Sequence, residues 1–151
     1  MESIEAADER YLTFWVKDKL CGLPIAHVVQ ILEMQPITPV PGYPAYAKGV
    51  MDLRNQIVPV VDLRLRFGKE AKPYDDRTCI LIHQHQSLPV GLIIDRVERV
   101  VSIPEVEIQP PADSAKDTDW FFSWGMGQIP ERQVLLMDVD KVIQPDQQQP
   151  A

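Results

Sequence analysis

The stretch "VMDLRNQIVPVVDLRLRFG" at residues 50–68 decides the fold of this chain. It holds an apolar run, a polar pair formed by Arg54 and Asn55, and a second apolar run. Two apolar runs joined by so short a polar connection predict a β-hairpin. Asn is well suited to a left-handed turn position, so the tip can be tight. Pro59 has no backbone donor, so the second strand should present that position to an edge or a bulge.

The same kind of pattern recurs along the chain. Further strands are expected at 11–16, 20–25, 78–83, 88–94, 97–103, 121–127 and 134–137. Turn signals every 8–12 residues then predict an all-β sandwich or small barrel. Short helical turns are expected at 63–68, closed by Gly68, and at 138–143, capped by Asp138.

One segment, 26–34, breaks the pattern. Val28, Ile31 and Leu32 follow each other at i, i+3 and i+4, which is the spacing of one face of a helix. One or two helical turns are therefore expected there.

The length of 151 residues suits one domain, or two small subdomains that share a core. The acidic, polar residues 1–9 are interpreted as a solvated leader. The Gln- and Pro-rich residues 144–151 are interpreted as a disordered tail. The folded domain is therefore expected to span 10–143.

The composition argues against several partners. The net charge is −7, with 22 acidic and 15 basic residues, so no basic surface for nucleic acid or for polybasic membrane attachment is expected. Neither a run of about 20 apolar residues nor a signal peptide is present, which predicts a cytoplasmic protein. Cys21 and Cys79 lie in apolar stretches and are interpreted as small buried hydrophobic residues.

The sequence contains no recognisable catalytic motif, and the favoured class is a binding module without a cofactor. His83 and His85 form an H-x-H pair without a third ligand, so no metal site is expected. His27 is interpreted as a solvated or core-edge residue. Asp138 and Asp140 fit a helix cap better than a pair of catalytic acids. A small β-barrel hydrolase or ligand sensor remains the alternative from another class.

Five segments together carry a resemblance to a known family. They are "YLTFWVKDKLCGLPIAHVVQI" (11–31), "ITPVPGYPAYAKGV" (37–50), "KGVMDLRNQIVPVVDLRLRFG" (48–68), "LPVGLIIDRVERVVSI" (88–103) and "FFSWGMGQIPERQVLLMDVDKVI" (121–143). In this order they resemble the CheW family, whose members are scaffolds that couple chemoreceptors to the histidine kinase CheA. The resemblance covers about residues 10–143.

The resemblance implies two five-stranded, SH3-like β-barrels packed around a shared apolar core, and a function without catalysis. One barrel would contact the regulatory domain of a CheA-type kinase, and the other a neighbouring barrel, so that rings form. The groove between the barrels would receive the helical tip of a chemoreceptor, as a helix is bound in an apolar groove. A related possibility is a CheW-like scaffold in an array that controls pili or a second-messenger enzyme.

The resemblance also implies which residues line the receptor groove: Val28, Gln30, Ile31, Leu53, Arg54 and Val97. Arg54 offers a planar fork of donors suited to a carboxylate or to helix carbonyls. Without the resemblance, a surface arginine whose stem covers apolar area would be favoured. Gly49 and Gly91 match family glycines; Gly49 should end a helical turn before a strand, and Gly91 should permit a close backbone approach.

Three departures from the family pattern, at Asp52, Asn55 and Gln30, concern this groove. The chain has Asp52-Leu53-Arg54-Asn55 where many relatives have Asn-Leu-Arg-Gly, and Gln30 where the family often has Glu. If Gln30 and Arg54 approach across the groove, the neutral amide holds the arginine less tightly than a carboxylate would. Arg54 should then be more available to the receptor.

Overall fold

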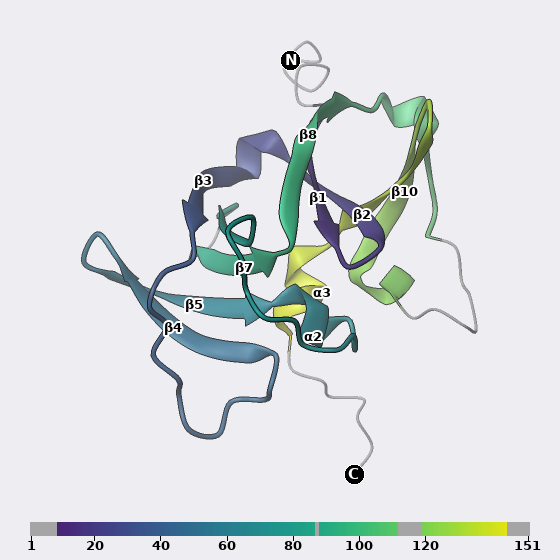
Figure 1. Cartoon of the computed structure of the whole chain (residues 1–151). Coiled ribbons are helices and arrows are strands. Elements are labelled where there is room, and N and C mark those ends of the chain that lie inside the picture. The colour runs from purple at the N-terminus through teal and green to yellow at the C-terminus, as the bar shows by residue number, and fades with distance from the viewer. Residues whose placement is uncertain (1–8, 87, 112–118, 145–151) are drawn as a thin grey trace.

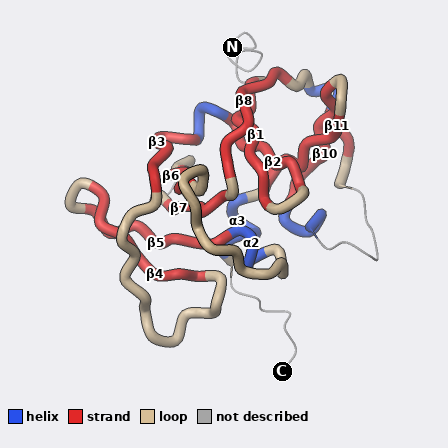
Figure 2. The backbone as a smooth tube through the Cα atoms, in the orientation of Figure 1, coloured by secondary structure: helices blue, strands red, loops and turns tan. Residues whose placement is uncertain are grey.

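The computed structural model describes residues 9–86, 88–111 and 119–144, and within them it is built mainly of short strands (Figures 1 and 2). The strands form two sheets. The all-β prediction is confirmed. Within the described ranges, no helix is long and apolar enough to span a bilayer.

The first sheet joins the two ends of the described chain. Its order is β8-β1-β2-β11-β10-β9, and β2 and β11 pair in parallel. The bounds are β1 (Arg10–Val16), β2 (Lys19–Pro24), β8 (Arg96–Ser102), β9 (Ile108–Gln109), β10 (Ser123–Ile129) and β11 (Arg132–Met137). Short helices η2 (Glu105–Glu107), η3 (Asp119–Phe122) and α3 (Val139–Ile143) flank these strands.

The second sheet is made from the middle of the chain, in the order β3-β6-β7-β5-β4. Its strands are β3 (Val28–Glu33), β4 (Ala47–Leu53), β5 (Gln56–Asp62), β6 (Cys79–His83) and β7 (Val90–Ile94). The 3-10 turn η1 (Ile25–His27) leads into this sheet, and helix α2 (Leu63–Arg66) follows β5. A bridge between Thr38 and Val50 pairs the chain beyond β3 with β4, which closes the sheet toward a barrel.

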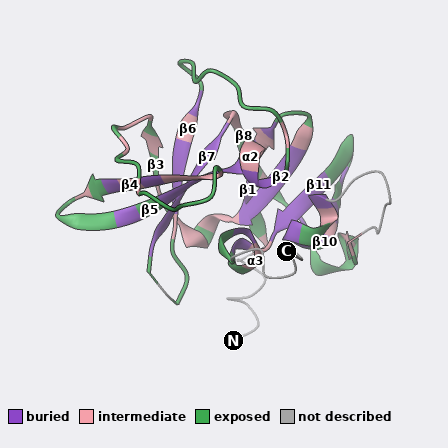
Figure 3. Ribbon diagram, turned by 90° about the horizontal axis from the view of Figure 1, so that it is seen from below, coloured by how far each residue is buried: buried purple, intermediate pink, exposed green. Residues whose placement is uncertain are grey.

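Three apolar clusters form the core. One lies within the first sheet, with Tyr11 and Leu136 among its members, and one within the second, with Val58 and Ile80. The largest lies between the sheets and draws buried side chains from both, including Phe14, Leu23, Leu81, Leu92 and Leu135. Figure 3 shows the buried stretches of β6 and β7 on one side and of β2 and β11 on the other. Two barrel-like sheets around a shared core are therefore confirmed. Within the described residues the first sheet has six strands and not the expected five, because the short strand β9 pairs with β10.

The hairpin predicted from residues 50–68 is present as β4 and β5. Leu53 pairs with Gln56, and the two residues between them, Arg54 and Asn55, have φ values of 53° and 67°. Two consecutive left-handed residues are the mark of a type I′ turn, whose twist matches the strands. Pro59 is exposed and stands one residue before β5 begins to pair with β7 at Val60, so its missing donor costs no bond to β7.

The helical prediction for 26–34 is wrong. After η1 the chain continues as strand β3, and the register of β3 against β6 shifts between Val28 and Gln30. Such a bulge adds one residue to a strand, so residues three apart come to the same face. The apparent i, i+3 spacing of Val28 and Ile31 arises from this bulge and not from a helix.

The expectation for Gly49 is also wrong, because the residue lies inside β4 and not at the end of a helical turn. Its φ is 140°, and an added Cβ would stand 2.0 Å from the carbonyl oxygen of Thr38. Gly91 lies inside β7 as expected. The closest groups to an added Cβ there would be the side chains of Ile80 and Val60, at 3.0 and 3.4 Å, and not a neighbouring backbone.

Candidate partner-binding surface

The residues assigned to the receptor groove lie on three elements. β3 carries Val28, Gln30 and Ile31, the tip of the β4–β5 hairpin carries Leu53 and Arg54, and β8 carries Val97. In Figure 1, β3 and β8 run on either side of β7, and the hairpin projects outward below β3. The elements are therefore gathered on one side of the molecule, but their side chains do not all face the same way.

The bulge in β3 separates Gln30 from its two neighbours. Val28 pairs with His83 and Ile31 with Leu81, so both share one face of the sheet. Val28 packs against the core between the sheets, and Ile31 is 46% exposed beside it. Gln30 pairs with Ile82 and therefore faces the opposite side, where the second sheet holds its own apolar cluster.

Val97 packs against the same shared core as Val28. Val97 is opposite Phe14 on β1 and is half-buried against the cluster between the sheets. Since Val28 packs on the same cluster from the second sheet, the two valines border the core from opposite barrels. Val28, Ile31 and Val97 are the partly exposed apolar residues of the predicted groove outside the hairpin, and they are called the strip below.

The hairpin tip places its two predicted residues differently. Leu53 packs against the apolar cluster within the second sheet, whose members include Met51 and Val58. Arg54 is exposed and, among the described residues, has no hydrogen bond or ion pair. The proposed contact between Gln30 and Arg54 is therefore not made, and Arg54 is held in place only by its turn.

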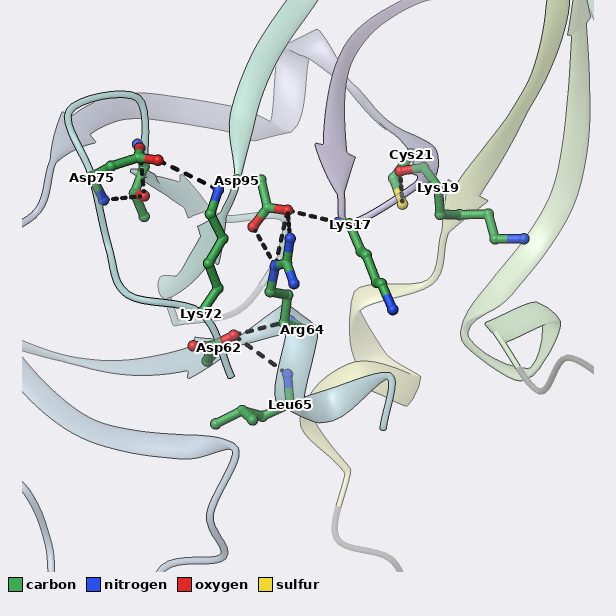
Figure 4. Close-up of polar contacts among 10 residues, drawn as sticks. Lys17, Lys19, Cys21, Asp62, Arg64, Leu65, Lys72, Asp75 and Asp95 are labelled. Carbon is green, nitrogen blue, oxygen red and sulfur yellow. Dashed lines mark hydrogen bonds and ion pairs between the residues drawn. The ribbon is translucent and has the colours of Figure 1, made fainter. Parts of the chain in front are cut away.

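An ion pair that sequence reasoning missed connects the two barrels (Figure 4). The Nε of Arg64 in α2 lies 2.9 Å from both carboxylate oxygens of Asp95, and its Nη2 lies 2.7 Å from Oδ2. The hydrogen bond to Asp95 raises the pKa of Arg64. Asp95 also accepts from the backbone N–H of Lys17, in the turn between β1 and β2, at 2.7 Å. Both residues lie in the quoted motifs "VVDLR" and "IIDR", but only the fold brings them together.

A second missed arginine, Arg66, is buried. Its Nε donates to the carbonyl oxygen of Val142 at 2.6 Å, and its Nη2 to that of Gln144 at 2.8 Å. The guanidinium also lies 4.3 Å from the ring centre of Tyr46 and 4.9 Å from that of Phe122. Arg66 thereby fixes the end of α3 to α2, since a buried guanidinium needs its donors satisfied.

Three histidines converge where the chain passes from the first sheet to the second. The rings of His27 and His85 stack at 3.8 Å, and the ring of His83 meets that of His27 edge-on at 5.6 Å. Burial, followed by the neighbouring imidazoles, lowers the pKa of His83 to about 4. Sequence spacing paired only His83 with His85, because His27 comes from a distant segment.

The described residues contain no group of three or more His, Cys, Asp or Glu side chains placed to hold a metal ion. The absence of a metal or a cofactor stays a prediction. Cys21 is buried, as expected, whereas Cys79 is only partly so.

Comparison with known proteins gives one consistent result. Residues 10–147 match the family model described as a CheW-like domain. The protein "Chemotaxis protein CheW" of Rhizobium meliloti is 33% identical over 93% of this chain and 90% of its own length. That of Klebsiella aerogenes is 29% identical over 92% and 84%. The crystal structure of the scaffolding protein TtCheW from Thermoanaerobacter tengcongensis superposes with a TM-score of 0.83 at 27% identity, over 92% of this chain and 94% of that one.

Proposed function

The chain belongs to the CheW-like domain family, and from this we propose that it is a non-catalytic adaptor that couples chemoreceptor tips to a CheA-type histidine kinase in chemotaxis arrays. The observation that carries the proposal is the match of nearly the whole chain to relatives named for chemotaxis and to a scaffolding protein. These names do not favour an array that controls pili or a second messenger. The proposal places the chain in the cytoplasm, at the receptors' cytoplasmic tips.

The geometry supports an adaptor with separate contact surfaces. The two sheets share one core and are joined by the Arg64–Asp95 ion pair, so surfaces on different barrels keep a fixed relation. We assign the receptor tip to the strip of Val28, Ile31 and Val97, with Arg54 at the rim. The kinase regulatory domain would bind another face, and a neighbouring barrel could extend the assembly into a ring.

Each contact of this kind is small, so the individual affinities should be on the order of micromolar and the array should depend on multivalency. The test is a pair of separate calorimetric titrations of the whole chain, one with a CheA-type regulatory domain and one with a receptor tip. Binding to neither partner would contradict the adaptor function.

The role of Arg54 can be tested without disturbing the fold. Arg54→Gly removes the side chain, and because φ is 53° at this position, glycine fits the turn at least as well. The melting temperature should therefore stay unchanged. The free energy of receptor binding should become less favourable by about 1–3 kcal/mol, as expected for an interface anchor. Asn55→Gly, at the other left-handed position of the same turn, is the matched control and should leave both affinities unchanged.

Kinase binding should survive Arg54→Gly. Equal losses toward both partners would show that Arg54 acts through the hairpin as a whole, and the groove assignment would be wrong. That outcome would leave the adaptor function itself standing, because both contacts would still be present.

A further inference from the structure

The histidine cluster fastens one chain segment to another at the crossover between the barrels. His27 ends η1, which carries the chain from β2 to β3, and His85 follows the end of β6. The backbone N–H of Gln84 donates to the carbonyl oxygen of His27 at 2.9 Å. The rings of His27 and His85 are stacked, with centroids 3.8 Å apart and planes 18° from parallel. This hydrogen bond and this ring stack both connect the segment after β6 to η1.

Two carboxylates lie near this cluster, and the charge of Asp140 opposes the lowering of the pKa of His83. The cluster borders a cavity of about 380 Å³, to which β2, β10, β11 and α3 also contribute. Besides the three imidazoles, the titratable side chains that line it are Asp138 and Asp140. Asp138 already accepts the backbone N–H of Lys141 as the cap of α3. Among the described residues, neither His83 nor His85 forms an ion pair with a carboxylate.

Two imidazoles that stack well when neutral repel each other when both are charged. Histidine ordinarily takes up its proton between about pH 5 and 8. Two charged rings at this separation would place like charges in contact, with a third ring beside them. The first proton leaves one ring neutral, and a charged ring over a neutral one is still attracted to it. The second proton, which would charge both rings, is therefore best accommodated by moving His85 away from His27.

We propose that the His27–His85 stack is a proton-sensitive clasp, which holds the segment after β6 on η1 when neutral and releases it on acidification. His27 is followed directly by Val28, and Val28 pairs with His83. Release would therefore loosen the start of β3, the strand that carries two residues of the proposed receptor strip. Mild acid would therefore weaken receptor binding by loosening β3. The strip itself needs no acidic or basic side chain for this effect.

The pKa of His83 supports the same direction. It is about 4 in the folded chain, below the value of about 6.5 for an unperturbed histidine. Between these two values the unfolded chain binds more protons than the folded chain, so the stability of the fold decreases as the pH falls through that window. Acid therefore weakens this region through His83 as well as through the stack.

The test is hydrogen exchange of the Gln84 amide in the whole chain at pH 7.5 and pH 5.5, with each rate corrected for the intrinsic effect of pH. The protection of this amide should fall at least tenfold at pH 5.5. His85→Phe keeps a ring in the stack, but this ring cannot take up a proton. The protection of the Gln84 amide in this variant should therefore be the same at both pH values. His27→Phe makes the same test from the other ring and serves if His85→Phe fails to fold.

Unchanged protection in the unmodified chain, or an equal loss in the phenylalanine variants, would overturn the proposal. The Val61 amide, in the buried part of β5 away from the cluster, is the internal control and should show no such change. Since the measurement needs no partner, its failure is distinct from failure of the adaptor function.

Discussion

At position 49 the fold has no room for any side chain larger than the hydrogen of glycine. Gly49 lies beside Thr38, whose N–H and C=O exchange hydrogen bonds of 2.8 and 2.9 Å with Val50. Because an added Cβ would stand 2.0 Å from the carbonyl oxygen of Thr38, Gly49→Ala must break this bridge. We expect the free energy of unfolding to fall by about 3 kcal/mol, measured by urea denaturation.

Gly42→Ala is the matched control. Gly42 also has a positive φ, of 88°, but nothing lies within 4 Å of an added Cβ. Gly42→Ala should therefore lower the free energy of unfolding by only about 1 kcal/mol, which is the cost of placing alanine in the left-handed region. If the two variants were equally stable, backbone conformation and not the close approach of Thr38 would explain the glycine.

Single residues were predictable where the reason is local. Asn55 was expected to suit a left-handed turn, and its φ is 67°. Gly49 was marked as a glycine of the family pattern, but its reason lies in Thr38, which closes the second sheet from outside the hairpin. The residues around Gly49 in the sequence do not indicate that the backbone of Thr38 lies so close to it.

At the scale of elements, the Arg64–Asp95 pair holds α2 to the junction of β7 and β8. Both side chains are largely shielded, with 17% and 16% exposed. We expect Arg64→Ala to lower the free energy of unfolding by about 2–3 kcal/mol, because among the described residues it leaves the Asp95 carboxylate with only the N–H of Lys17. Thermal and urea denaturation would measure the loss.

Arg99→Ala provides the comparison for this pair. Arg99 forms an ion pair with Glu131, but their side chains are 52% and 46% exposed. Solvent screens such a pair, so the loss should stay below about 1 kcal/mol. A loss as large as that of Arg64→Ala would mean that exposure does not decide the strength of these pairs.

The elements themselves were largely predictable, because each strand carries an apolar run closed by turn residues. The short turns at α2 and α3 were also expected from local signals, and the predicted cap Asp138 accepts the backbone N–H of Lys141. Asp62 caps α2 in the same way, which the sequence analysis did not predict. The failure at 26–34 has a physical cause: a bulged strand and a helical turn can both place Val28 and Ile31 on one face. The same bulge turns Gln30 to the face opposite Val28 and Ile31.

At the scale of the whole molecule, the shared core predicts that the two barrels unfold together. The three tryptophans, Trp15, Trp120 and Trp124, all belong to the first sheet or to η3 beside it. Leu81 lies in the second sheet and is fully buried in the core between the sheets. Leu81→Ala should cost about 2–5 kcal/mol and shift the fluorescence and circular dichroism transitions equally.

A fluorescence transition that stayed in place while the circular dichroism transition moved would show that the barrels unfold separately. The matched control is Leu88→Ala, because Leu88 is 79% exposed and should leave both transitions unchanged. The two-barrel arrangement was implied by the family resemblance alone; the strand pattern by itself allowed a sandwich as well.

In the sequence, the strands of the second sheet lie between β2 and β8 of the first sheet. This order has a consequence for synthesis on the ribosome. β1 and β2 emerge first, yet β1 pairs with β8 and β2 with β11, and the hydrogen bond from Thr13 to Arg99 spans 86 positions. The strands of the second sheet are contiguous, so that sheet can assemble while the rest is still being translated. The first hairpin must therefore wait with its apolar face uncovered, and the nascent chain is most exposed to aggregation until its last strands arrive.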